Sequence, residues 1–211
     1  FSFGTNVVRK GLVVFQFTIS LMIIIATIVV SNQITHTKNR DLGFVKDHVI
    51  TLPASASLTS SFDRLKNELI NSQQIKDIAL SWADMFNMYS NGGGFTWKGY
   101  DETKSALITF NGITPNYLKL MNIKMSKGRY FHEDESHEGT NVIINPAMAK
   151  LMGEAGIVGG QIFRGNDPAM SIVGITDHFI YNDIYGNPEP MMFFVSDTKE
   201  FPDFGKIVIK L

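Results

Sequence analysis

A long apolar run dominates the N-terminal part of the chain. Residues Leu12 to Val30 (LVVFQFTISLMIIIATIVV) carry no charge, with Arg9 and Lys10 before the run and Lys38 and Arg40 after it. At about 1.5 Å per residue, a helix over this run is roughly 28 Å long, which matches the hydrocarbon core of a bilayer. The run therefore predicts a transmembrane helix with membrane lipid around it. The residues that mark the span are Leu12, Phe15, Phe17, Leu21, Ile25 and Val30.

Two other interpretations of this run stay open. A secretory signal has an apolar region of roughly 7 to 15 residues and two small residues at its cleavage site, whereas this run is longer and Ala26-Thr27-Ile28 lacks the second small residue. A core helix is usually shorter and shows a polar face. Gln16, Thr18 and Ser20 do interrupt the run, but such uncharged residues can bond neighbouring helices inside a membrane. Basic residues on both sides of the run leave its orientation undecided.

A polar stretch follows the apolar run. Ser31 to Asp41 (SNQITHTKNRD) contains no Gly or Pro, so the helix can continue beyond the bilayer until Gly43 ends it. The pattern predicts a short helical stalk, and residues 1–41 are expected to form the transmembrane helix and the stalk together.

The next segment has the pattern of a small α/β unit. The β-branched residues from His48 to Leu52 predict a strand that Pro53 stops. Apolar residues recur at helical spacing from Ser60 to Gln74, and Ile75 to Trp82 predicts a second strand. Strand, helix and strand in this order predict a βαβ-like unit.

From Asn87 the chain changes to short apolar runs separated by turn residues. Asn91 to Gly94 (NGGG) predicts a flexible break. The strands expected after it cover residues 95–97, 106–111, 141–144, 161–163, 169–175 and 191–195. A helical turn is expected over Tyr117 to Leu120, and a helix over Pro146 to Met152, which proline opens and glycine closes. The fold class is therefore α+β, with a mostly β subdomain at about residues 87–198. The final run, Lys206 to Leu211 (KIVIKL), predicts a strand that begins a further unit of a longer protein.

Composition narrows the function classes. Among 211 residues, Lys plus Arg is 19 and Asp plus Glu is 20, so the formal net charge is −1. A nearly neutral chain without a basic stripe lacks the electrostatic pattern of nucleic-acid binding, so no nucleic-acid partner is expected. The absence of cysteine excludes disulfides, thiolate chemistry and cysteine zinc sites, although it does not fix the compartment.

Two polar segments could suggest a ligand site. Gly153 to Gly160 (GEAGIVGG) has the glycine content of a phosphate-binding loop, but it follows a predicted helix and opens a predicted strand, the reverse of what such loops need. The segment 132–138 (HEDESHE) is close to the HExxH zinc motif. On a helix, however, His132 and His137 lie about 140° apart and could not share a metal. We expect no cofactor or metal site, and a solvated acidic loop at 132–138.

Two further groups of side chains have alternative interpretations. Asp177, His178 and Asp183 could supply an acid and a base for hydrolysis, but no nucleophile motif such as GxSxG accompanies them. An apolar group consists of Trp82, Met85, Phe86, Met88 and Tyr89. It could contact a ligand or partner, yet core packing or a seam between subdomains is the favoured interpretation. No catalytic residue is predicted.

Several short motifs together resemble a known family. The order NGITPNYL from Asn111, KGRYF from Lys127, VIIN from Val142, IVGGQI from Ile157 and IVGITD from Ile172 is similar to the periplasmic core domain of MacB-like ABC transporter permeases. The structural positions of this motif set are Gly128, Arg129, Phe131, Asn145, Gly159, Gly174 and Asp177. Gly160 departs from the pattern, because a lysine or arginine often follows the glycine there. The stretches 14–20 and 42–44 resemble the first membrane helix of FtsX-related permeases.

The resemblance implies a fold and a place in the cell. It implies a periplasmic domain between two membrane helices of the bacterial inner membrane, with residues after about 31 in the periplasm and the N-terminus in the cytoplasm. Residues 42–86 would form the first half of a porter-like α/β subdomain, 87–198 a β-rich subdomain of the type called Sabre, and 199–211 the start of the returning porter-like half.

The resemblance also implies a non-enzymatic function. Such permeases work with an ATP-binding cassette ATPase subunit and with a dimer partner or second repeat. Some also work with a periplasmic or outer-membrane partner. They couple ATP-driven movement of membrane helices to substrate export or to activation of that partner, and the stalk is the expected mechanical link. A membrane-anchored sensor or ligand-binding ectodomain is the alternative, followed by an anchored hydrolase. The transported substrate cannot be inferred from the sequence.

Overall fold

The structure is a computed structural model. It describes residues 3–38, 42–45, 47–85, 88, 90–101, 103, 105–134, 138–181, 188–198 and 201–211. The chain divides into two compact units, residues 1–41 and residues 42–211, and each is described by itself.

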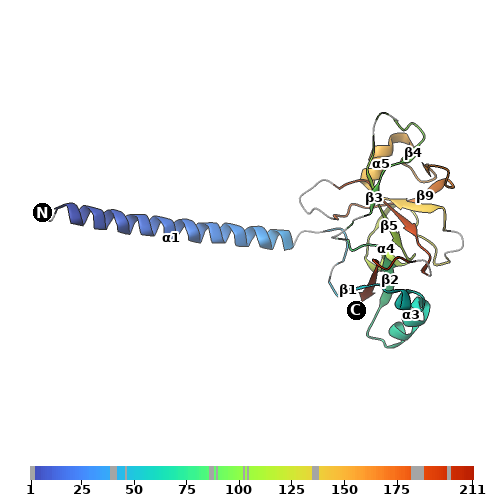
Figure 1. Ribbon diagram of the computed structural model, residues 1–211, viewed down its shortest axis with the longest axis horizontal. Coiled ribbons are helices and arrows are strands. Elements are labelled where there is room, and N and C mark those ends of the chain that lie inside the picture. The colour runs from blue at the N-terminus through green and yellow to red at the C-terminus, as the bar shows by residue number, and fades with distance from the viewer. Residues whose placement is uncertain are drawn as a thin grey trace. The chain divides into compact units, whose positions relative to one another are not determined.

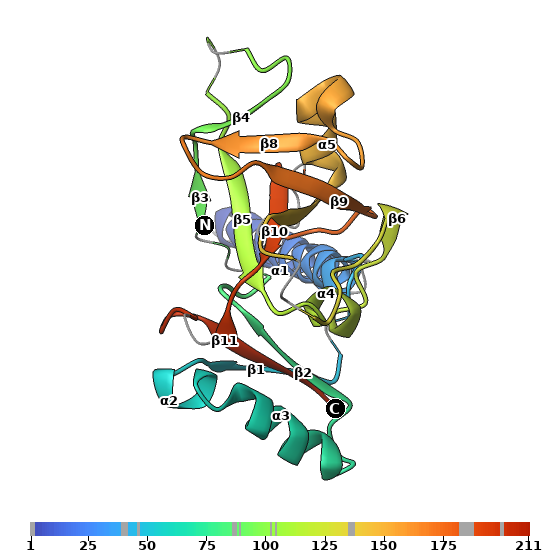
Figure 2. The same ribbon diagram turned by 90° about the vertical axis from the view of Figure 1, so that its right-hand side faces the viewer.

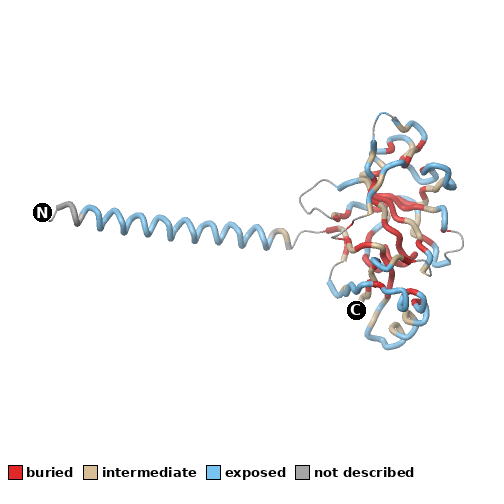
Figure 3. The backbone as a smooth tube through the Cα atoms, in the orientation of Figure 1, coloured by how far each residue is buried: buried red, intermediate tan, exposed pale blue. Residues whose placement is uncertain are grey.

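The first unit is a single helix, α1 (Phe3–Lys38). The side chains from Val7 to Thr35 are exposed, and by length and composition this stretch is a candidate membrane span (Figure 1, Figure 3). The Thr18 and Thr27 hydroxyls donate to the carbonyl oxygens four residues earlier at 2.8 Å, so both are satisfied within the helix. The helix continues through the polar residues to Lys38 as predicted, and the last stalk residues, 39–41, lie outside the described residues.

One part of the second unit consists of three strands and two helices. Strands β1 (Val49–Pro53) and β2 (Asp77–Ser81) both pair antiparallel with β11 (Lys206–Lys210), which lies between them. The helices α2 (Ala56–Thr59) and α3 (Phe62–Asn71) connect β1 to β2 and lie beside the three strands (Figure 2). The predicted βαβ-like unit is thus a split one, because its parallel strands are separated by a strand from the end of the chain.

The boundaries in this region differ from the sequence prediction. The helix expected over 60–74 is α3, which ends before Gln73 (φ +59°), and the short helix α2 before it was not predicted. The first strand starts one residue later than expected, after His48 (φ +60°), and it includes Pro53. Proline has no backbone N–H to donate. It is tolerated there because β1 is an edge strand among the described residues, so no second strand needs a hydrogen bond from Pro53. The strand expected over 75–82 is shortened to Asp77–Ser81.

The remaining elements form the β-rich part of the same sheet. Its strands are β3 (Asn91–Gly92), β4 (Phe95–Trp97), β5 (Ile108–Ile113), β6 (Met125–Gly128), β7 (Asn141–Ile144), β8 (Gln161–Arg164), β9 (Met170–Thr176) and β10 (Met191–Val195). Its helices are α4 (Tyr117–Leu120), α5 (Pro146–Met152) and the 3-10 turn η2 (Gly153–Ala155). Among the described residues the strand order is β1-β11-β2-β5-β10-β7-β9-β8-β4, with β3 on β5 and β6 on β9.

Several of these elements have the predicted bounds, and others do not. The predictions for β4, β7, β10, α4 and α5 are confirmed. The predictions missed β6 and placed a flexible break where Asn91–Gly92 forms β3 against Thr109 and Ile108. Strand β5 starts two residues later than expected and extends to Ile113. The α+β fold class, with an N-terminal apolar helix and a mostly sheet domain, is confirmed.

The core of the domain follows the sheet. One buried cluster joins α4 to strands β2, β5 and β10 and includes Tyr117, Leu118 and Phe193. A second lies under α5 and includes Ile108, Ile144 and Met148. A third lies between α3 and the strands β2 and β11. Buried positions therefore concentrate along the central strands (Figure 3).

Candidate functional site at the junction of β2 and β5

The first three-stranded part meets the β-rich part where β2 lies beside β5. The ladder between these strands has one register pair, Ser81 with Ile113, whereas β10 and β5 pair along the whole of Met191–Val195. Two backbone bonds flank the pair, from the Trp82 N–H to the Gly112 carbonyl at 2.9 Å and from the Thr114 N–H to the Leu80 carbonyl at 3.0 Å. Because the ladder is so short, side chains must hold much of this junction.

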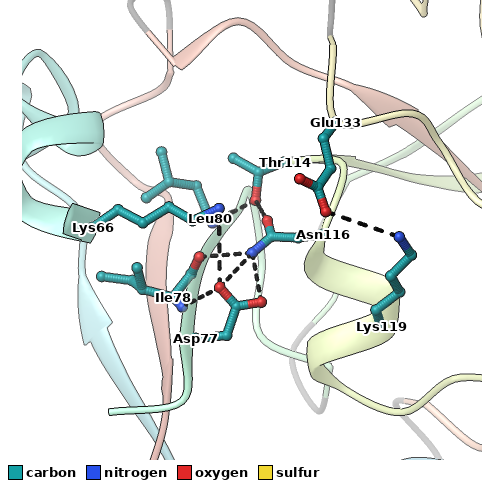
Figure 4. Close-up of polar contacts among 8 residues, drawn as sticks. All are labelled: Lys66, Asp77, Ile78, Leu80, Thr114, Asn116, Lys119 and Glu133. Atoms are coloured by element: carbon teal, nitrogen blue, oxygen red, sulfur yellow. Dashed lines mark hydrogen bonds and ion pairs between the residues drawn. The ribbon is translucent and has the colours of Figure 1, made fainter. Parts of the chain in front are cut away.

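Asn116 is the main polar link on one side of the junction (Figure 4). Its Nδ2 donates to Oδ1 and Oδ2 of Asp77 and to the Ile78 carbonyl, each at 2.9 Å. Its Oδ1 accepts from the Thr114 hydroxyl at 2.9 Å, and that hydroxyl oxygen accepts from the Leu80 N–H at 3.0 Å. The loop between β5 and α4 is thereby bonded to both the start and the middle of β2.

Trp82 holds the junction at the other end of β2. Its indole Nε1 donates to the Ser196 hydroxyl at 3.0 Å. The ring lies edge-on to Phe194, with centroids 4.9 Å apart and planes at 88°. Gly112 makes this packing feasible, because a Cβ added there would lie 2.5 Å from the indole. The indole therefore joins the end of β2 to both β5 and the residue after β10.

A buried polar pair lies between these two links. Asn111 Nδ2 donates to the Ser81 hydroxyl at 2.9 Å, and that hydroxyl donates to the Ala83 carbonyl at 2.7 Å. Nearby, burial raises the pKa of Tyr117 well above its ordinary value, although a hydrogen bond with Ser81 opposes the shift. The phenol is therefore neutral at physiological pH. Within the described residues, this arrangement contains no nucleophile beside a base and no group of three metal-binding side chains.

The predicted motif positions lie in the β-rich part rather than at the junction. Gly128 ends β6 with φ +75°, and a Cβ there would meet the Val173 carbonyl oxygen at 2.3 Å. Gly174 is its register partner in β9, and the Gly159 N–H donates to the Ile172 carbonyl at 2.8 Å. These three glycines lie where β6, β9 and the turn before β8 approach one another closely.

Asn145, Phe131 and Asp177 have different surroundings. Asn145 caps α5, because its Oδ1 accepts from the Met148 N–H at 2.9 Å, and the same oxygen accepts from the Met191 N–H at 3.0 Å. Phe131 is buried in the core. Asp177 is exposed, and its Oδ1 accepts from the following backbone N–H at 2.8 Å.

Arg129 forms an ion pair that corrects one prediction. Its guanidinium lies 2.7 Å from Oε1 of Glu138, a residue expected in a solvated loop but found with no exposed side-chain surface. Oε1 also accepts from the His132 N–H at 3.0 Å, and Oε2 accepts from Asn141 Nδ2 at 2.9 Å. Burial alone would raise the pKa of Glu138, but these hydrogen bonds and the Arg129 charge outweigh it and lower the pKa.

The other candidate segments are placed as follows. Gly153 to Gly160 follows α5 and precedes β8, which is the helix-then-strand order that was predicted. Met85 and Met88 are buried in the core, as predicted, and Trp82 lies at the junction. His137, Asp183, Phe86 and Tyr89 lie outside the described residues.

Sequence reasoning did not find the bonds that hold the junction. Asn116 belongs to the NGITPNYL motif, which by itself assigns it no role, and its acceptor Asp77 lies 39 residues away. The one local signal is an asparagine directly after Thr114-Pro115, because asparagine side chains in turns often hydrogen-bond to nearby backbone groups. The partner of Trp82, Ser196, is 114 residues away and had no signal.

Comparisons with known proteins agree with this fold. The family model of the MacB-like periplasmic core domain matches residues 12–208. The periplasmic region of MacB from Actinobacillus actinomycetemcomitans is similar at a TM-score of 0.51 and 14% identity, over 80% of this chain and 76% of that one. The extracellular domain of the noncanonic ABC-type transporter YknZ from Gram-positive bacteria gives a TM-score of 0.48 and 18% identity, over 77% and 81% of the two chains.

A third structure is a permease domain from Porphyromonas gingivalis, with a TM-score of 0.46 and 11% identity. That likeness covers 65% of this chain, which spans just over half, 56%, of the P. gingivalis domain. A search of curated proteins gives no match. The family match extends over most of the chain, and the mixed sheet agrees with it. The chain belongs to the family of MacB-like periplasmic core domains found in ABC-type permeases.

Proposed function

We propose that this chain is the extracytoplasmic part of an inner-membrane permease that transmits movement from membrane helices to the periplasm. In this proposal α1 crosses the membrane with its N-terminus in the cytoplasm, and residues after about 31 lie in the periplasm. A separate ATP-binding cassette subunit hydrolyses ATP, and the permease pairs with a second copy or repeat. The domain itself is not an enzyme. Its movement either exports a substrate or activates a periplasmic or outer-membrane partner.

The observation that carries this proposal is the continuity of α1. The helix runs from the apolar residues through the polar residues 31–38 without a break. At about 1.5 Å per residue, this polar part adds roughly 12 Å of helix beyond the apolar run. A flexible tether would suffice for a simple anchor, whereas a continuous helix carries tilt and rotation beyond the lipid. The length of the polar part therefore favours transmission over anchoring.

The division of the domain is part of the same proposal. Residues 42–86 and 199–211 form the porter-like part, residues 87–198 form the Sabre-like part, and the β2 and β5 junction connects them. Within the described residues β1 has one strand neighbour, and Ile50 and Leu52 on it are 42% and 46% exposed. Such an apolar edge is expected of a subdomain that receives a further strand and helix. The motif positions from Gly128 to Asp177 have a structural role and stabilise the Sabre-like part.

The proposed ATPase partner is tested by cross-linking proteins in the native membranes and then purifying the full-length protein. We expect an ATPase of the ATP-binding cassette type among the cross-linked proteins. A kinase or another signalling module in its place would support the sensor alternative and contradict the permease.

The orientation is tested with single cysteines, because the chain contains none. A cysteine replacing the exposed Asn166 should react with a membrane-impermeant maleimide in cells with a permeabilised outer membrane. A cysteine replacing Val8, which precedes the apolar run, should react only after the inner membrane is broken. The reverse pattern would contradict the assigned orientation.

A further inference from the structure

A groove of about 510 Å³ lies along the β-rich part, between Trp82 and the β4 and β8 ladder. Its lining includes Trp82, Phe95, Phe110, Arg164, Met170 and Phe194. Trp82 follows β2, and the other side chains come from β4, β5, β8, β9 and β10, the strands labelled in Figure 2. The groove is therefore built on strands. Its volume lies within the range of about 300 to 1,000 Å³ that is usual for small-molecule sites.

One cation faces this aromatic groove. Arg164 is the register partner of Phe95 across the β4 and β8 ladder, so the two side chains lie on the same face of the sheet. The guanidinium carbon lies 5.0 Å from the centroid of the Phe95 ring and 5.6 Å from that of the Phe110 ring. Both distances are within the reach of cation–π attraction, so two aromatic rings hold the guanidinium in place.

The contacts of Arg164 leave its hydrogen-bonding edge available. Cation–π contacts use the flat face of a guanidinium, whereas its N–H groups point outward in the plane. Within the described residues Arg164 has no ion pair, in contrast to Arg129, which lies 2.7 Å from Glu138. A planar fork of donors beside apolar surface matches a carboxylate, which accepts two parallel hydrogen bonds.

The charged side chains that line the groove limit the charge of the anion that it can bind. Asp167 also lines it, three residues after Arg164. One cation and one carboxylate in the same groove favour a ligand with a single negative charge over a dianion such as a phosphate monoester, because the second charge would meet Asp167.

We propose that this groove binds an apolar monocarboxylate, with Arg164 bonding the carboxylate and the aromatic and methionine side chains covering the apolar body. This chemistry is found both in free aromatic or acyl acids and in the C-terminal residue of a peptide. The proposal stands apart from the transmission function and does not depend on it.

The test uses the whole chain in lipid nanodiscs. The chain has two tryptophans, so Trp97→Phe leaves Trp82, in the groove, as the only indole reporter. The probes are 4-phenylbutyrate and N-acetylphenylalanine, each with its uncharged amide, and phenyl phosphate as the dianion. We expect saturable changes in Trp82 fluorescence with the acids, and binding weaker by roughly tenfold or more for the amides and the dianion. A tighter complex with N-acetylphenylalanine would identify the peptide source, and a tighter one with 4-phenylbutyrate the free acid.

Substitutions complete the test. Arg164→Gln should weaken acid binding by roughly tenfold or more, because charged hydrogen bonds are lost. Arg164→Lys, which keeps the charge and loses the fork, should have an intermediate effect. Arg64→Gln is the matched control, since that arginine lies on α3 and pairs with Glu68. Equal binding of acids and amides, unchanged binding by Arg164→Gln with an unchanged melting temperature, or no saturable signal at millimolar probe would overturn the proposal.

Discussion

Asn116 donates its side-chain amide to both carboxylate oxygens of Asp77 at 2.9 Å, and this contact ties α4 and the loop before it to the first residue of β2 (Figure 4). The same amide also bonds the Ile78 carbonyl, so a single side chain serves two neighbouring residues of the strand. Because β2 and β5 share a single register pair, this contact connects the two parts of the sheet that the backbone ladder joins only briefly.

Replacing Asn116 by aspartate should weaken the junction. Asn116→Asp keeps the shape, removes the donor and places a second carboxylate against Asp77. We expect the free energy of unfolding to fall by roughly 2–3 kcal/mol, measured by urea denaturation. Asn166→Asp, in the exposed turn after β8, is the matched control and should change stability by less than about 0.5 kcal/mol. Equal losses in the two variants would show that the Asp77 contact contributes nothing.

The Trp82 and Ser196 pair should behave as one unit. Trp82→Phe keeps an aromatic ring and removes the indole N–H, while Ser196→Ala removes its acceptor at 3.0 Å. Each single variant should lose about 1 kcal/mol of unfolding free energy, and the double variant should lose about as much as one of them. The double-mutant cycle by urea denaturation, followed through Trp97 fluorescence or circular dichroism, measures this coupling. Fully additive losses would mean that the hydrogen bond makes no net contribution.

Gly112 should not accept a side chain. In Gly112→Ala the new Cβ would lie 2.5 Å from the indole, so Trp82 must move from its position against Phe194. Overpacking of this kind typically lowers stability by about 1–3 kcal/mol. Thermal melting and the tryptophan emission maximum should both change. Gly139→Ala is the control, because its Cβ meets nothing within 4 Å. An unaltered spectrum and melting temperature in Gly112→Ala would refute the packing described for the junction.

Glu138 should make the stability of the domain depend on acidity. Its pKa is lowered in the folded state, so the unfolded chain binds more protons in the titration range and stability rises with pH there. The contribution is complete above the unfolded value of about 4.3 and is lost as the pH falls through the lower folded value. The free energy of unfolding, measured between about pH 3 and pH 7, should therefore depend less on pH in Glu138→Gln than in the parent chain. The exposed Glu154→Gln should keep the parent slope, and equal slopes for all three proteins would exclude the buried ion pair.

The elements that the sequence predicted well are those with local signals at both ends. Helix α5 has Asn145 as its cap, Pro146 at its first position and Gly153 after its last, so its limits are set within a few residues. Strand β7 is a compact run of β-branched residues before the same asparagine. In contrast, β6 consists of Met-Ser-Lys-Gly, mostly exposed, and forms a strand because β9 pairs with it.

The parts of the site that escaped prediction depend on distant partners. Nothing local to Lys206–Lys210 shows that this strand lies between β1 and β2. Likewise, the burial of Glu138 follows from its pairing with Arg129, and the position of Arg164 follows from the β4 and β8 register. From the local sequence alone, a charged residue is expected to be exposed to solvent. Only the fold supplies the oppositely charged or aromatic partner that makes a buried or packed position favourable.

The claim that α1 transmits movement rests on a helix that stays continuous beyond its apolar run. Proline at Ile34 should break it, because proline in a helix interior removes a hydrogen bond and clashes with the preceding turn, at about 3 kcal/mol. Ile34→Ala keeps the helix and serves as the control. Neither substitution alters the ATPase subunit that we propose as partner, so ATP hydrolysis reports separately on the assembly of the complex.

The most direct measurement is a distance between spin labels on cysteines at Asn32 and Asn166, in the full-length protein assembled with the proposed ATPase partner. The account predicts that trapping with ATP and vanadate shifts the distance distribution in the parent protein and in Ile34→Ala, and that Ile34→Pro abolishes the shift. Identical distributions with and without trapped nucleotide in the parent protein, while the complex hydrolyses ATP, would contradict it.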